Sequence, residues 1–548
     1  MSEVRENCHI PKLQEQFAEG KMDRRDFLRY STLLGMSAAA AYAFVGKVTG
    51  QDFAAPAHAQ EIPTGGTVRI SMRVPEVTTP HTFSWVYDSN IVRQVSEYLT
   101  RTGQDNITRP YLAESWSASD DLRTWTLTMR DVKWHDGRPF TAEDAAWNLR
   151  HALDEATGSS VIGLMKGYML NEVDGKTELW DANAIEVVDD RTLRLNLKEA
   201  QVAVPEHLFH YPMLILDPEE GGSFGVGSRG TGPFELVEHA VGEKSVLKAR
   251  PDYWGDGPYL DELQFIDLGD DPSAAIGAMA SQQVHGIYEG DVSQLDVFKA
   301  MPHVTIYEAL TAQTGVARVQ VDREEFSDPR LRKAMRLAVD TQRCLELAHR
   351  GLGAPGEHHH VSPVHPDYQK IEFMGRDVEA AKALLAEAGY PDGFSTEIAG
   401  KKDPAWELQA VQAMVEQWKD AGINVNINVM PSAQFWDVWD KVPFGFTAWT
   451  HRPLGFMVLG LAYRTGVPWN ESNYSNPEFD ELLTQAEGTL DIEERREIMG
   501  KLEKIMQEDG PITQPLWRSL FVAYDSRVKG FKLHPTFYIF GQEIGIES

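Results

Sequence analysis

Cysteine is nearly absent from this chain of 548 residues. Cys8 and Cys344 are the two cysteines, and no Cys-x-x-Cys pair or Cys/His zinc spacing occurs. Two isolated thiols cannot form the disulfide framework of a small secreted domain, and they cannot complete a structural zinc site. They also leave a redox or metal carrier without soft ligands, so we expect no metal and no cofactor.

Positive charge is scarce as well. Lysine and arginine number 52 against 82 aspartates and glutamates, which gives a net charge of −30. The excess is spread along the chain rather than gathered in a tail, and it repels phosphate backbones and anionic lipid surfaces. Nucleic-acid binding is therefore excluded.

Long hydrophobic runs are also missing. The best candidate, "YSTLLGMSAAAAYAFVG" at 30–46, is diluted by Ser, Gly and Tyr. It falls short of the ~20 apolar residues that a membrane-spanning helix needs. An amphipathic or membrane-spanning helix is one interpretation of this segment, but the residues on either side of it favour an export signal.

The segment stands between "DRRDFLR" at 23–29 and "APAHAQE" at 55–61. A charged region, a short apolar region and small residues around Ala59 follow one another as in a secretory signal, and paired Arg24 and Arg25 resemble the twin-arginine type. We expect residues 1–59 to direct export through the twin-arginine translocase, which carries folded proteins. The mature protein would then be periplasmic.

The rest of the chain has the composition of a folded protein, with 42% hydrophobic residues and 14 tryptophans. Strand-like and helix-like segments alternate without repeats, which favours a mixed α/β fold. Val68, Ile70 and Met72 alternate as a half-buried strand does, and Thr141 is placed to cap a helix over 142–154. At roughly 100–200 residues per domain, the length implies two to four domains.

Signals for the starts and ends of helices are clear beyond residue 327. Asp328 and Asn476 each precede a proline, as N-caps do, while Gly389 and Gly422 follow helical segments as C-terminal signals. The strand "INVNINV" directly follows a helix, as in a βαβ unit. The tail "VKGFKLHPTFYIF" at 528–540 returns to strand character, so we expect it to rejoin the first lobe.

One stretch fits neither a strand nor an ordinary loop. "FGFTAWTHRPLG" at 444–455 is too polar for a core strand and too aromatic for a solvated loop. It places an arginine three residues after a tryptophan, which indicates a functional surface.

Five separated segments resemble the family 5 solute-binding proteins, which are the dipeptide- and oligopeptide-binding proteins of ABC importers. They are, in the order of the family, "YLAESWSASDDLRTWTLTMRDVKWHDGRPFTAEDAAWNLR", "GTGPFELVEHAVGEKSVLKARPDYWGDGPYLDEL", "DPRLRKAMRLAVD", "AAKALLAEAGYPDGF" and "YSNPEFDELLTQA". The resemblance implies a two-lobed periplasmic-binding-protein fold of the large form, with an extra subdomain in lobe I. A two-segment hinge would let the lobes close around a buried ligand.

The resemblance also implies domain boundaries and partners. We expect lobe I to comprise 60–104, 228–316 and 513–548, with the extra subdomain at 105–227 and lobe II at 317–512. The ligand-loaded, closed monomer would deliver its ligand to an ABC permease and ATPase complex.

In the peptide binders of this family, lobe II carries a tryptophan followed three residues later by an aspartate that pairs with the free α-amine of the peptide. This chain keeps the tryptophan as Trp449 but has Arg452 in place of the aspartate. A buried cation disfavours an ammonium group and suits a carboxylate, as in an opine, a blocked peptide or another amino-acid derivative. Two alternatives stay open: Arg452 pairs with an acidic neighbour, or it points to solvent.

Further ligand-site candidates follow from the same resemblance. They are Thr450 and His451 beside Arg452, Gln320 near the hinge strand, Tyr87 after the first strand of lobe I, and Trp436. Each has a structural alternative, and a hydrogen-bonded structural role is more common for a single histidine. Trp436 and Trp439 share one face of an expected helix, where core packing is the more common role of at least one. Adjacent histidines at 358–360 stand on a loop and are not expected to bind a metal.

An exported hydrolase of peptides or related small molecules is the competing function. It would need a nucleophile and a base, or a pair of carboxylates, gathered in one cleft. The chain lacks the HExxH pattern of metalloproteases. We therefore expect a binding protein without catalytic residues.

Overall fold

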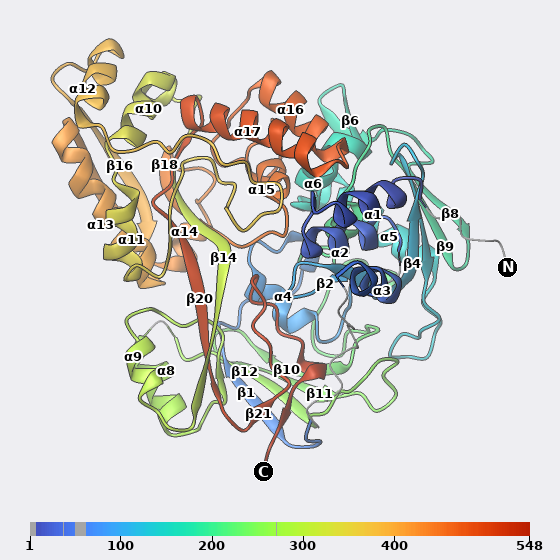
Figure 1. Ribbon diagram of the computed structural model, residues 1–548. Coiled ribbons are helices and arrows are strands. Elements are labelled where there is room, and N and C mark those ends of the chain that lie inside the picture. The colour runs from blue at the N-terminus through green and yellow to red at the C-terminus, as the bar shows by residue number, and fades with distance from the viewer. Residues whose placement is uncertain (1–6, 37, 50–61, 270) are drawn as a thin grey trace.

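The computed structural model describes residues 7–36, 38–49, 62–269 and 271–548 (Figure 1). Ala59, the predicted end of the export signal, lies outside the described residues. Among the residues described, no helix is both long and apolar enough to cross a membrane.

One large sheet joins the two lobes (Figure 1). In spatial order its main path is β10 (Phe234–Ala240), β11 (Lys244–Ala249), β12 (Glu262–Ile266), β1 (Thr67–Ser71), β13 (Gly286–Ile287), β20 (Leu516–Asp525), β14 (Val304–Val319), β18 (Phe444–Trp449), β16 (Phe394–Lys401) and β17 (Ile423–Met430). Short strands β15 (Gly353–Pro355) and β19 (Ile512–Thr513) pair with β20 and β14.

The two longest strands connect the lobes. β14 and β20 pair antiparallel from Val304↔Asp525 to Thr314↔Trp517, with a register shift between Leu310 and Gln313. Both strands extend from the lobe I half of the sheet into the lobe II half (Figure 1). They are therefore the two segments of the expected hinge.

Lobe I carries α4 (Val86–Val92), α8 (Pro272–Ala280) and α9 (Leu295–Lys299). Its extra subdomain is built on the separate sheet β4 (Ala113–Ala118), β5 (Thr124–Met129), β9 (Thr192–Asn196) and β8 (Ile185–Asp189), with α5 (Ala142–Leu153) and α6 (Val161–Met169). Smaller elements of lobe I and this subdomain are β2 (Thr100–Thr102), β3 (Thr108–Pro110), β6 (Leu170–Val173), β7 (Lys176–Leu179), α7 (Val204–His207), β21 (Val528–Lys529) and β22 (Gly545–Ile546).

Lobe II has its own hydrophobic core between the sheet and the helices α10 (Pro329–Leu337), α11 (Thr341–His349), α12 (Val378–Glu387) and α13 (Ala405–Trp418). β16, α13 and β17 form the predicted βαβ unit, because the two strands pair in parallel. The chain then passes through α14 (Ser432–Trp436) and β18 to α15 (Gly455–Ala462), α16 (Pro477–Gly488) and α17 (Ile492–Glu508). These three helices extend from lobe II toward the subdomain (Figure 1).

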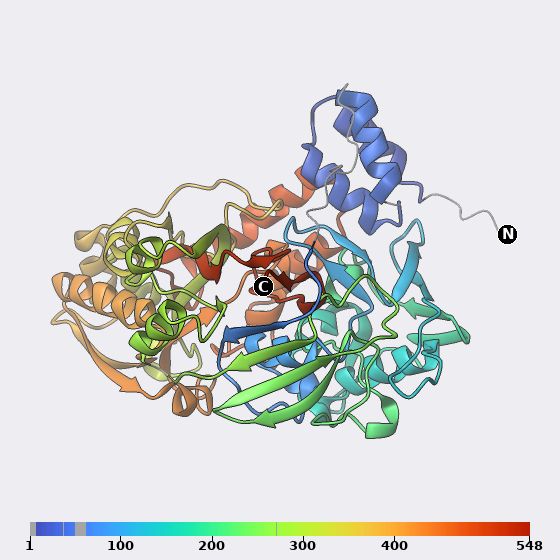
Figure 2. The same cartoon turned by 90° about the horizontal axis from the view of Figure 1, so that it is seen from below.

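Three helices precede the first strand: α1 (Ile10–Ala18), α2 (Arg24–Leu33) and α3 (Ala38–Thr49). They form one group against the subdomain and α17 (Figure 2). Arg24 and Arg25 lie exposed in the first turn of α2.

Local sequence signals predict many element ends correctly. Thr141 accepts a hydrogen bond from Asp144 N at the start of α5, and Asp328 and Asn476 cap α10 and α16 through their side chains. Gly389 and Gly422 take the left-handed backbone that such C-terminal positions require, with φ values of 96° and 80°.

Two expectations are wrong. Residues 444–449 form a fully buried strand, β18, which the polar residues that follow had argued against. The tail at 528–540 forms a strand only over Val528–Lys529, because most of it packs as an irregular segment around Phe537 and Tyr538.

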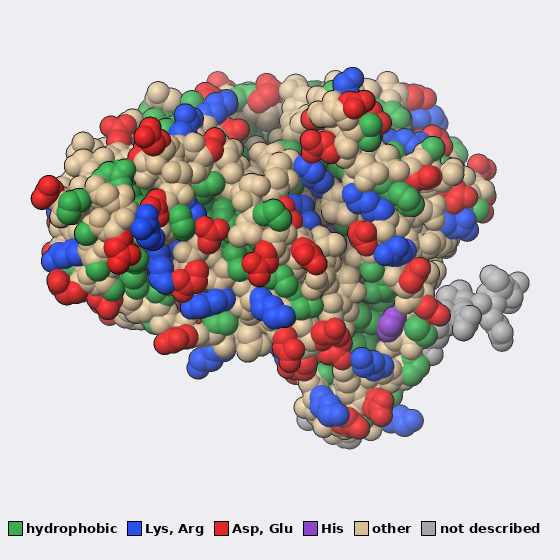
Figure 3. Space-filling model, turned by 90° about the horizontal axis from the view of Figure 1, so that it is seen from above, with side chains coloured by type: hydrophobic (Ala, Val, Ile, Leu, Met, Phe, Trp, Pro, Cys, Tyr) green, Lys and Arg blue, Asp and Glu red, His purple; other side chains and the backbone are tan. Residues whose placement is uncertain are grey.

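Charged side chains of both signs are interspersed on the face shown in Figure 3. The acidic excess is therefore distributed, as the sequence indicates, and does not form a single-sign patch on this face.

Candidate functional site

An aromatic chamber lies between the lobes. Its side chains belong to both lobes and to the subdomain, and they are Trp85, Tyr211, Trp436, Trp439, Trp449 and Trp469. Trp85 of lobe I meets Trp436 of lobe II with ring centroids 5.3 Å apart. The contacts continue from Trp436 to Trp439 at 6.0 Å and from Trp449 to Trp469 at 5.8 Å. The rings are tilted or edge-to-face, as aromatic pairs prefer.

A buried carboxylate fixes the indole of Trp449. Glu471 Oε1 accepts a hydrogen bond from Trp449 Nε1 at 3.0 Å, and Oε2 accepts from Thr447 Oγ1 at 2.6 Å. Arg318 Nε completes the set by donating to Glu471 Oε2 at 2.6 Å. Arg318 and Glu471 are both almost completely buried, so this ion pair is rigidly held beneath the chamber.

Arg452 lines the same chamber. Its side chain is buried at 4% exposure, and its guanidinium carbon lies 5.3 Å from the centre of the Tyr211 ring across the cleft. Its Nη1 donates to the carbonyl oxygens of Thr450 and His451 and to Thr450 Oγ1. Among the residues that the structure describes, Arg452 forms no ion pair with a carboxylate, and its buried Nε has no hydrogen-bond partner. It neither points to solvent nor pairs with an acidic neighbour.

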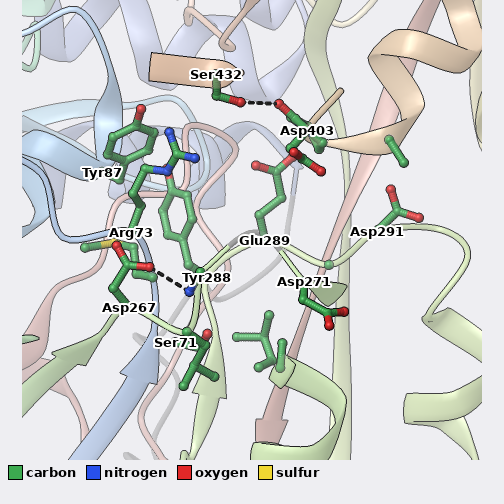
Figure 4. A pocket seen from close by; sticks show the side chains of 18 of the residues that line it. Ser71, Arg73, Tyr87, Asp267, Asp271, Tyr288, Glu289, Asp291, Asp403 and Ser432 are labelled. Carbon is green, nitrogen blue, oxygen red and sulfur yellow. Dashed lines mark hydrogen bonds between the residues drawn. The ribbon is translucent and has the colours of Figure 1, made fainter. Parts of the chain in front are cut away.

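A polar chamber adjoins the aromatic one, since Trp85 and Trp436 line both. Lobe I provides Arg73, Tyr87, Tyr288 and the carboxylates of Asp267, Asp271, Glu289 and Asp291, while lobe II provides Lys401, Asp403 and Ser432. Figure 4 shows Glu289 and Asp403 pointing into this space from opposite sides. Carboxylates outnumber cations along its wall.

Two ion pairs fix charges near the polar chamber. Arg518 on the hinge strand β20 donates from Nη1 to Glu289 Oε1 at 2.6 Å. Lys401 pairs with Glu407 at the start of α13, and both are buried. Burial raises the pKa of the Glu407 carboxyl, while Lys401 lowers it.

The space between the lobes is small. The polar chamber has a volume of about 250 Å³ and the aromatic chamber about 20 Å³. Ligand pockets commonly measure roughly 300–1,000 Å³. The cleft therefore suits one small molecule, and a group that reaches Arg452 must displace the aromatic side chains around it.

Comparison with known proteins assigns the fold. The family model "Bacterial extracellular solute-binding proteins, family 5 Middle" matches residues 108–464, which is more than half of the chain. The chain belongs to the family 5 solute-binding proteins.

Individual members of the family are distant relatives. The dipeptide-binding protein DppE of Bacillus subtilis is 26% identical over 494 residues, which cover 83% of this chain and 86% of DppE. The structure of AgaA from A. tumefaciens R10 with agropinic acid superposes with a TM-score of 0.78 at 23% identity, covering 88% of this chain and 99% of AgaA. DppA of Helicobacter pylori with the peptide STSA gives a TM-score of 0.76 at 20% identity, covering 89% and 99%. This chain therefore shares the two-lobed family 5 fold over nearly its whole length.

Five of the predicted ligand residues of this family 5 protein line the two chambers. Trp449, Thr450 and Arg452 line the aromatic chamber, Tyr87 lines the polar one, and Trp436 lines both. Trp436 ends the short helix α14, and Trp439 in the following turn lines the aromatic chamber with it, so neither is confined to the core.

His451 and Gln320 do not line the chambers. His451 accepts a hydrogen bond from Ala312 N at 3.1 Å and bonds to Asn106 Oδ1 at 3.0 Å. Burial, with the nearby cationic and imidazole groups, lowers its pKa well below the ordinary value, so it is neutral. Gln320 Nε2 donates to Asp440 O at 3.0 Å, next to the turn that carries Trp439. Both residues stabilise the loops around the site and do not form part of its surface.

Sequence reasoning did not identify Trp85, Tyr211, Trp469 or Glu471. Trp85 lies two residues before Tyr87, so its proximity to a predicted residue was the available signal. Tyr211 and Trp469 come from irregular segments of the subdomain and lobe II, which are remote in the chain and meet with ring centroids 5.9 Å apart.

The adjacent histidines are buried in separate surroundings. His358 Nδ1 accepts from Gln514 N, and His360 Nδ1 bonds to the Tyr463 hydroxyl. Among the described residues, the group whose ligand atoms lie close enough to share an ion is Asp136, Asp217 and Glu219. These three carboxylates form ion pairs with Arg138 and Arg229 instead.

Three serines stand in short patterns that hydrolases also use, Ser223 in Gly-x-Ser-x-Gly, and Ser245 and Ser526 in Ser-x-x-Lys. None of them lines the two chambers, and Ser526 Oγ donates to His303 O at 2.9 Å. Ser245 is completely buried on β11, where Oγ bonds to His239 Nδ1 at 2.9 Å. A nucleophile in that position cannot meet a substrate.

Proposed function

We propose that this family 5 protein is the periplasmic substrate-binding component of an ABC importer, and that it captures a small peptide-like or opine-like amino-acid derivative. The observation that supports this most strongly is Arg452, a buried arginine without a carboxylate partner among the described residues, in an aromatic chamber between the lobes. A guanidinium fork at that place is suited to a carboxylate of the ligand.

The two chambers suggest how such a ligand lies. Its carboxylate enters the aromatic chamber and binds Arg452, while its apolar part stacks between tryptophans. Its other end reaches the polar chamber, where carboxylates outnumber cations, so hydroxyl or ammonium groups are favoured there. A dipeptide in the orientation of the peptide binders would place its ammonium group against Arg452 and is disfavoured.

Delivery follows from the hinge. A ligand that contacts both lobes stabilises the closed conformation, because it binds that conformation better than the open one. The permease would recognise the closed form. The relatives support this assignment, since curated members include binding proteins for dipeptides and glutathione.

A thermal-shift screen of the purified protein tests the proposal. Opines, blocked peptides and other acidic amino-acid derivatives are compared with free dipeptides at matched concentrations. A true ligand at a hundredfold excess over its Kd stabilises the protein by about 2.7 kcal/mol. Stabilisation by an acidic derivative supports the proposal, whereas turnover of any hit, or a preference for free dipeptides alone, contradicts it.

A further inference from the structure

A buried loop of lobe II carries the three adjacent histidines. We call residues 357–367, "EHHHVSPVHPD", the histidine loop. His358, His359 and His360 are at most 1% exposed, although the loop forms neither a strand nor a helix. His358 and His360 have φ values of 64° and 62°, in the left-handed region that residues other than glycine seldom adopt. Such a backbone costs free energy and persists only where surrounding contacts impose it, so the loop is held in one defined conformation.

The first part of the histidine loop supports Trp449. The ring of His360 meets the Trp449 indole nearly edge-on, with centroids 5.6 Å apart and an angle of 84° between the planes. His360 Nδ1 bonds to the Tyr463 hydroxyl at 2.7 Å, which fixes the orientation of the imidazole. Trp449 lines the aromatic chamber and His360 does not. His360 therefore contacts the indole from outside the chamber.

The second part of the histidine loop reaches the backbone of Arg452. Ser362 N donates to His365 Nδ1 at 3.0 Å, and His365 Nε2 lies 3.1 Å from Arg452 O. Because Nδ1 accepts a hydrogen bond, the imidazole hydrogen is on Nε2, which donates to the Arg452 carbonyl oxygen. His365 is buried at 4% exposure. This single tautomer fixes the direction of the Arg452 carbonyl group.

Asp367 holds the other end of the same turn. It is completely buried, and its Oδ1 accepts from Gly455 N at 2.9 Å while its Oδ2 accepts from Phe456 N at 3.1 Å. These N–H groups belong to the first turn of α15 and have no partner within the helix. A Cβ added to Gly455 would lie 2.7 Å from Val361 Cγ1, so the two segments are in close contact. The histidine loop therefore binds the backbone on both sides of residues 453–454.

The direction of the Arg452 guanidinium depends on this backbone. Nη1 donates to Thr450 O at 3.3 Å and to His451 O at 3.1 Å, so the side chain is bound to its own turn and to no carboxylate of the described residues. A turn that rotates would carry the guanidinium with it. Recognition of a carboxylate requires its binding group to be held within about 0.5 Å, by packing and by hydrogen bonds from surrounding residues.

We propose that the histidine loop is a positioning element of the aromatic chamber. His365 and Asp367 fix the turn that carries Arg452, and His360 supports Trp449. These three residues line neither chamber, so they act through residues that do. The consequence that the loop sets the affinity for a ligand carboxylate rests on the proposed function, whereas the positioning of Arg452 does not.

NMR spectroscopy of the full-length protein labelled with ¹⁵N-arginine tests this positioning without a ligand. The Nε–H group of Arg452 is buried and has no hydrogen-bond partner among the described residues, so its resonance reports on the surroundings of this side chain. Its absence from the spectrum of Arg452→Lys identifies it. The other arginine resonances show whether the rest of the fold is unchanged.

His365→Gln and His365→Asn form a matched pair of variants. Glutamine places an amide N–H donor close to the position of Nε2 and can keep the bond to Arg452 O. Asparagine is one methylene shorter, so it can accept from Ser362 N but cannot reach Arg452 O. We expect the Arg452 resonance to shift or disappear in His365→Asn and to keep its wild-type position in His365→Gln. An unchanged resonance in His365→Asn, or an equal shift in both variants, overturns the proposal.

Asp367→Asn covers the case in which His365→Asn does not fold. Asparagine keeps one acceptor for the first turn of α15 and loses the other, so we expect the Arg452 resonance to shift. The same exchange at the exposed Asp392 is the control and should leave the resonance unchanged. An Asp367→Asn spectrum that matches the wild type at Arg452 overturns the proposal. No ligand enters these measurements, so their failure is distinguishable from failure of the thermal-shift screen.

Discussion

Arg452 is the residue on which the proposed choice of ligand rests most directly. It is buried, it faces Tyr211 across the cleft, and its charge is opposite to that of the aspartate at this place in the peptide binders that the chain resembles. In the proposal, the charge of this one side chain selects the charge of the ligand group beside it. Substituting Arg452 therefore tests the ligand proposal separately from the fold.

We predict that Arg452→Ala weakens binding of an acidic ligand by roughly ten- to a hundredfold, because a charge-assisted hydrogen bond is typically worth about 1.5–3 kcal/mol. Arg452→Asp should shift preference toward ligands with a free amine. Calorimetry on the wild type and both variants, with one acidic ligand and one free dipeptide, measures this. Equal affinities in all three proteins would show that Arg452 does not contact the ligand.

Glu471 holds the Trp449 indole, and we propose that it positions this ring for the ligand. Glu471→Gln leaves Arg318 without a buried counter-charge, so we expect it to lower the free energy of unfolding by about 3–5 kcal/mol. Glu487→Gln breaks a comparable buried pair, with Arg464 at 2.7 Å, outside the chambers. Both variants should be destabilised, but only Glu471→Gln should also weaken ligand binding and change the tryptophan fluorescence. Unchanged affinity in Glu471→Gln would mean that the Trp449 indole needs no anchor.

At this scale the sequence identifies residues through local patterns alone. Trp449 and Arg452 could be singled out because the resemblance, carried by five other segments, implies a tryptophan and a charged residue three positions apart in lobe II. Tyr211 and Trp469 could not, since each acquires its role only by meeting a segment that is remote in the chain. His451 lies in the predicted loop but is turned inward by its bonds to Ala312 and Asn106.

Elements are predicted best at their ends and worst where their burial depends on the rest of the fold. Asp328 and Asn476 act as caps because a carboxylate or amide oxygen satisfies free backbone N–H groups without help from the tertiary structure. The sequence did not predict β18, because polar residues follow Trp449. All six residues of this strand are nevertheless buried between neighbouring strands. The prediction for the tail at 528–540 is wrong in the opposite direction. Its apolar residues indicate a strand, but most of them are buried in side-chain packing without pairing to a neighbouring strand.

α17 offers a pH prediction. Burial, with further contributions from Asp367 and Glu357, raises the pKa of Glu503 to about 9, whereas a glutamate in an unfolded chain titrates near ~4.3. The folded state therefore binds a proton that the unfolded state releases between these pH values. Stability falls as pH rises across that window.

Glu503→Gln mimics the protonated side chain and does not titrate. We expect its advantage in melting temperature over the wild type to be small at pH 4 and to grow steadily up to pH 8. Glu497→Gln, an exchange elsewhere on α17, serves as the control and should show no such trend. A constant difference between Glu503→Gln and wild type across this range would mean that Glu503 is ionised in the folded protein.

For the whole molecule, the continuous sheet and the cleft between the lobes follow from long-range pairing that no local pattern encodes. β14 and β20 come from segments some two hundred residues apart in the chain, as the pair Thr314↔Trp517 shows. Their antiparallel pairing turns two lobes into one hinged body. The family resemblance predicted this architecture correctly, whereas the residues alone indicate only a mixed α/β chain of several domains.

Export is the last property that belongs to the whole molecule. Arg24 and Arg25 stand exposed at the start of α2, and the bond from Arg25 Nε to Asp105 O at 3.2 Å is an exposed one. If a twin-arginine translocase reads this pair, changing both to lysine should block translocation, while the melting temperature stays within about 1 °C because surface substitutions of this kind usually cost less than about 0.5 kcal/mol. Lys21→Arg, at an exposed cation between α1 and α2, is the control and should export normally. Immunoblots of periplasmic and cytoplasmic fractions measure the export of each variant. A double-lysine variant that reaches the periplasm in normal amount would indicate the general secretory route. A variant that stays in the cytoplasm but melts at a much lower temperature would mean that the two arginines stabilise the fold rather than direct export.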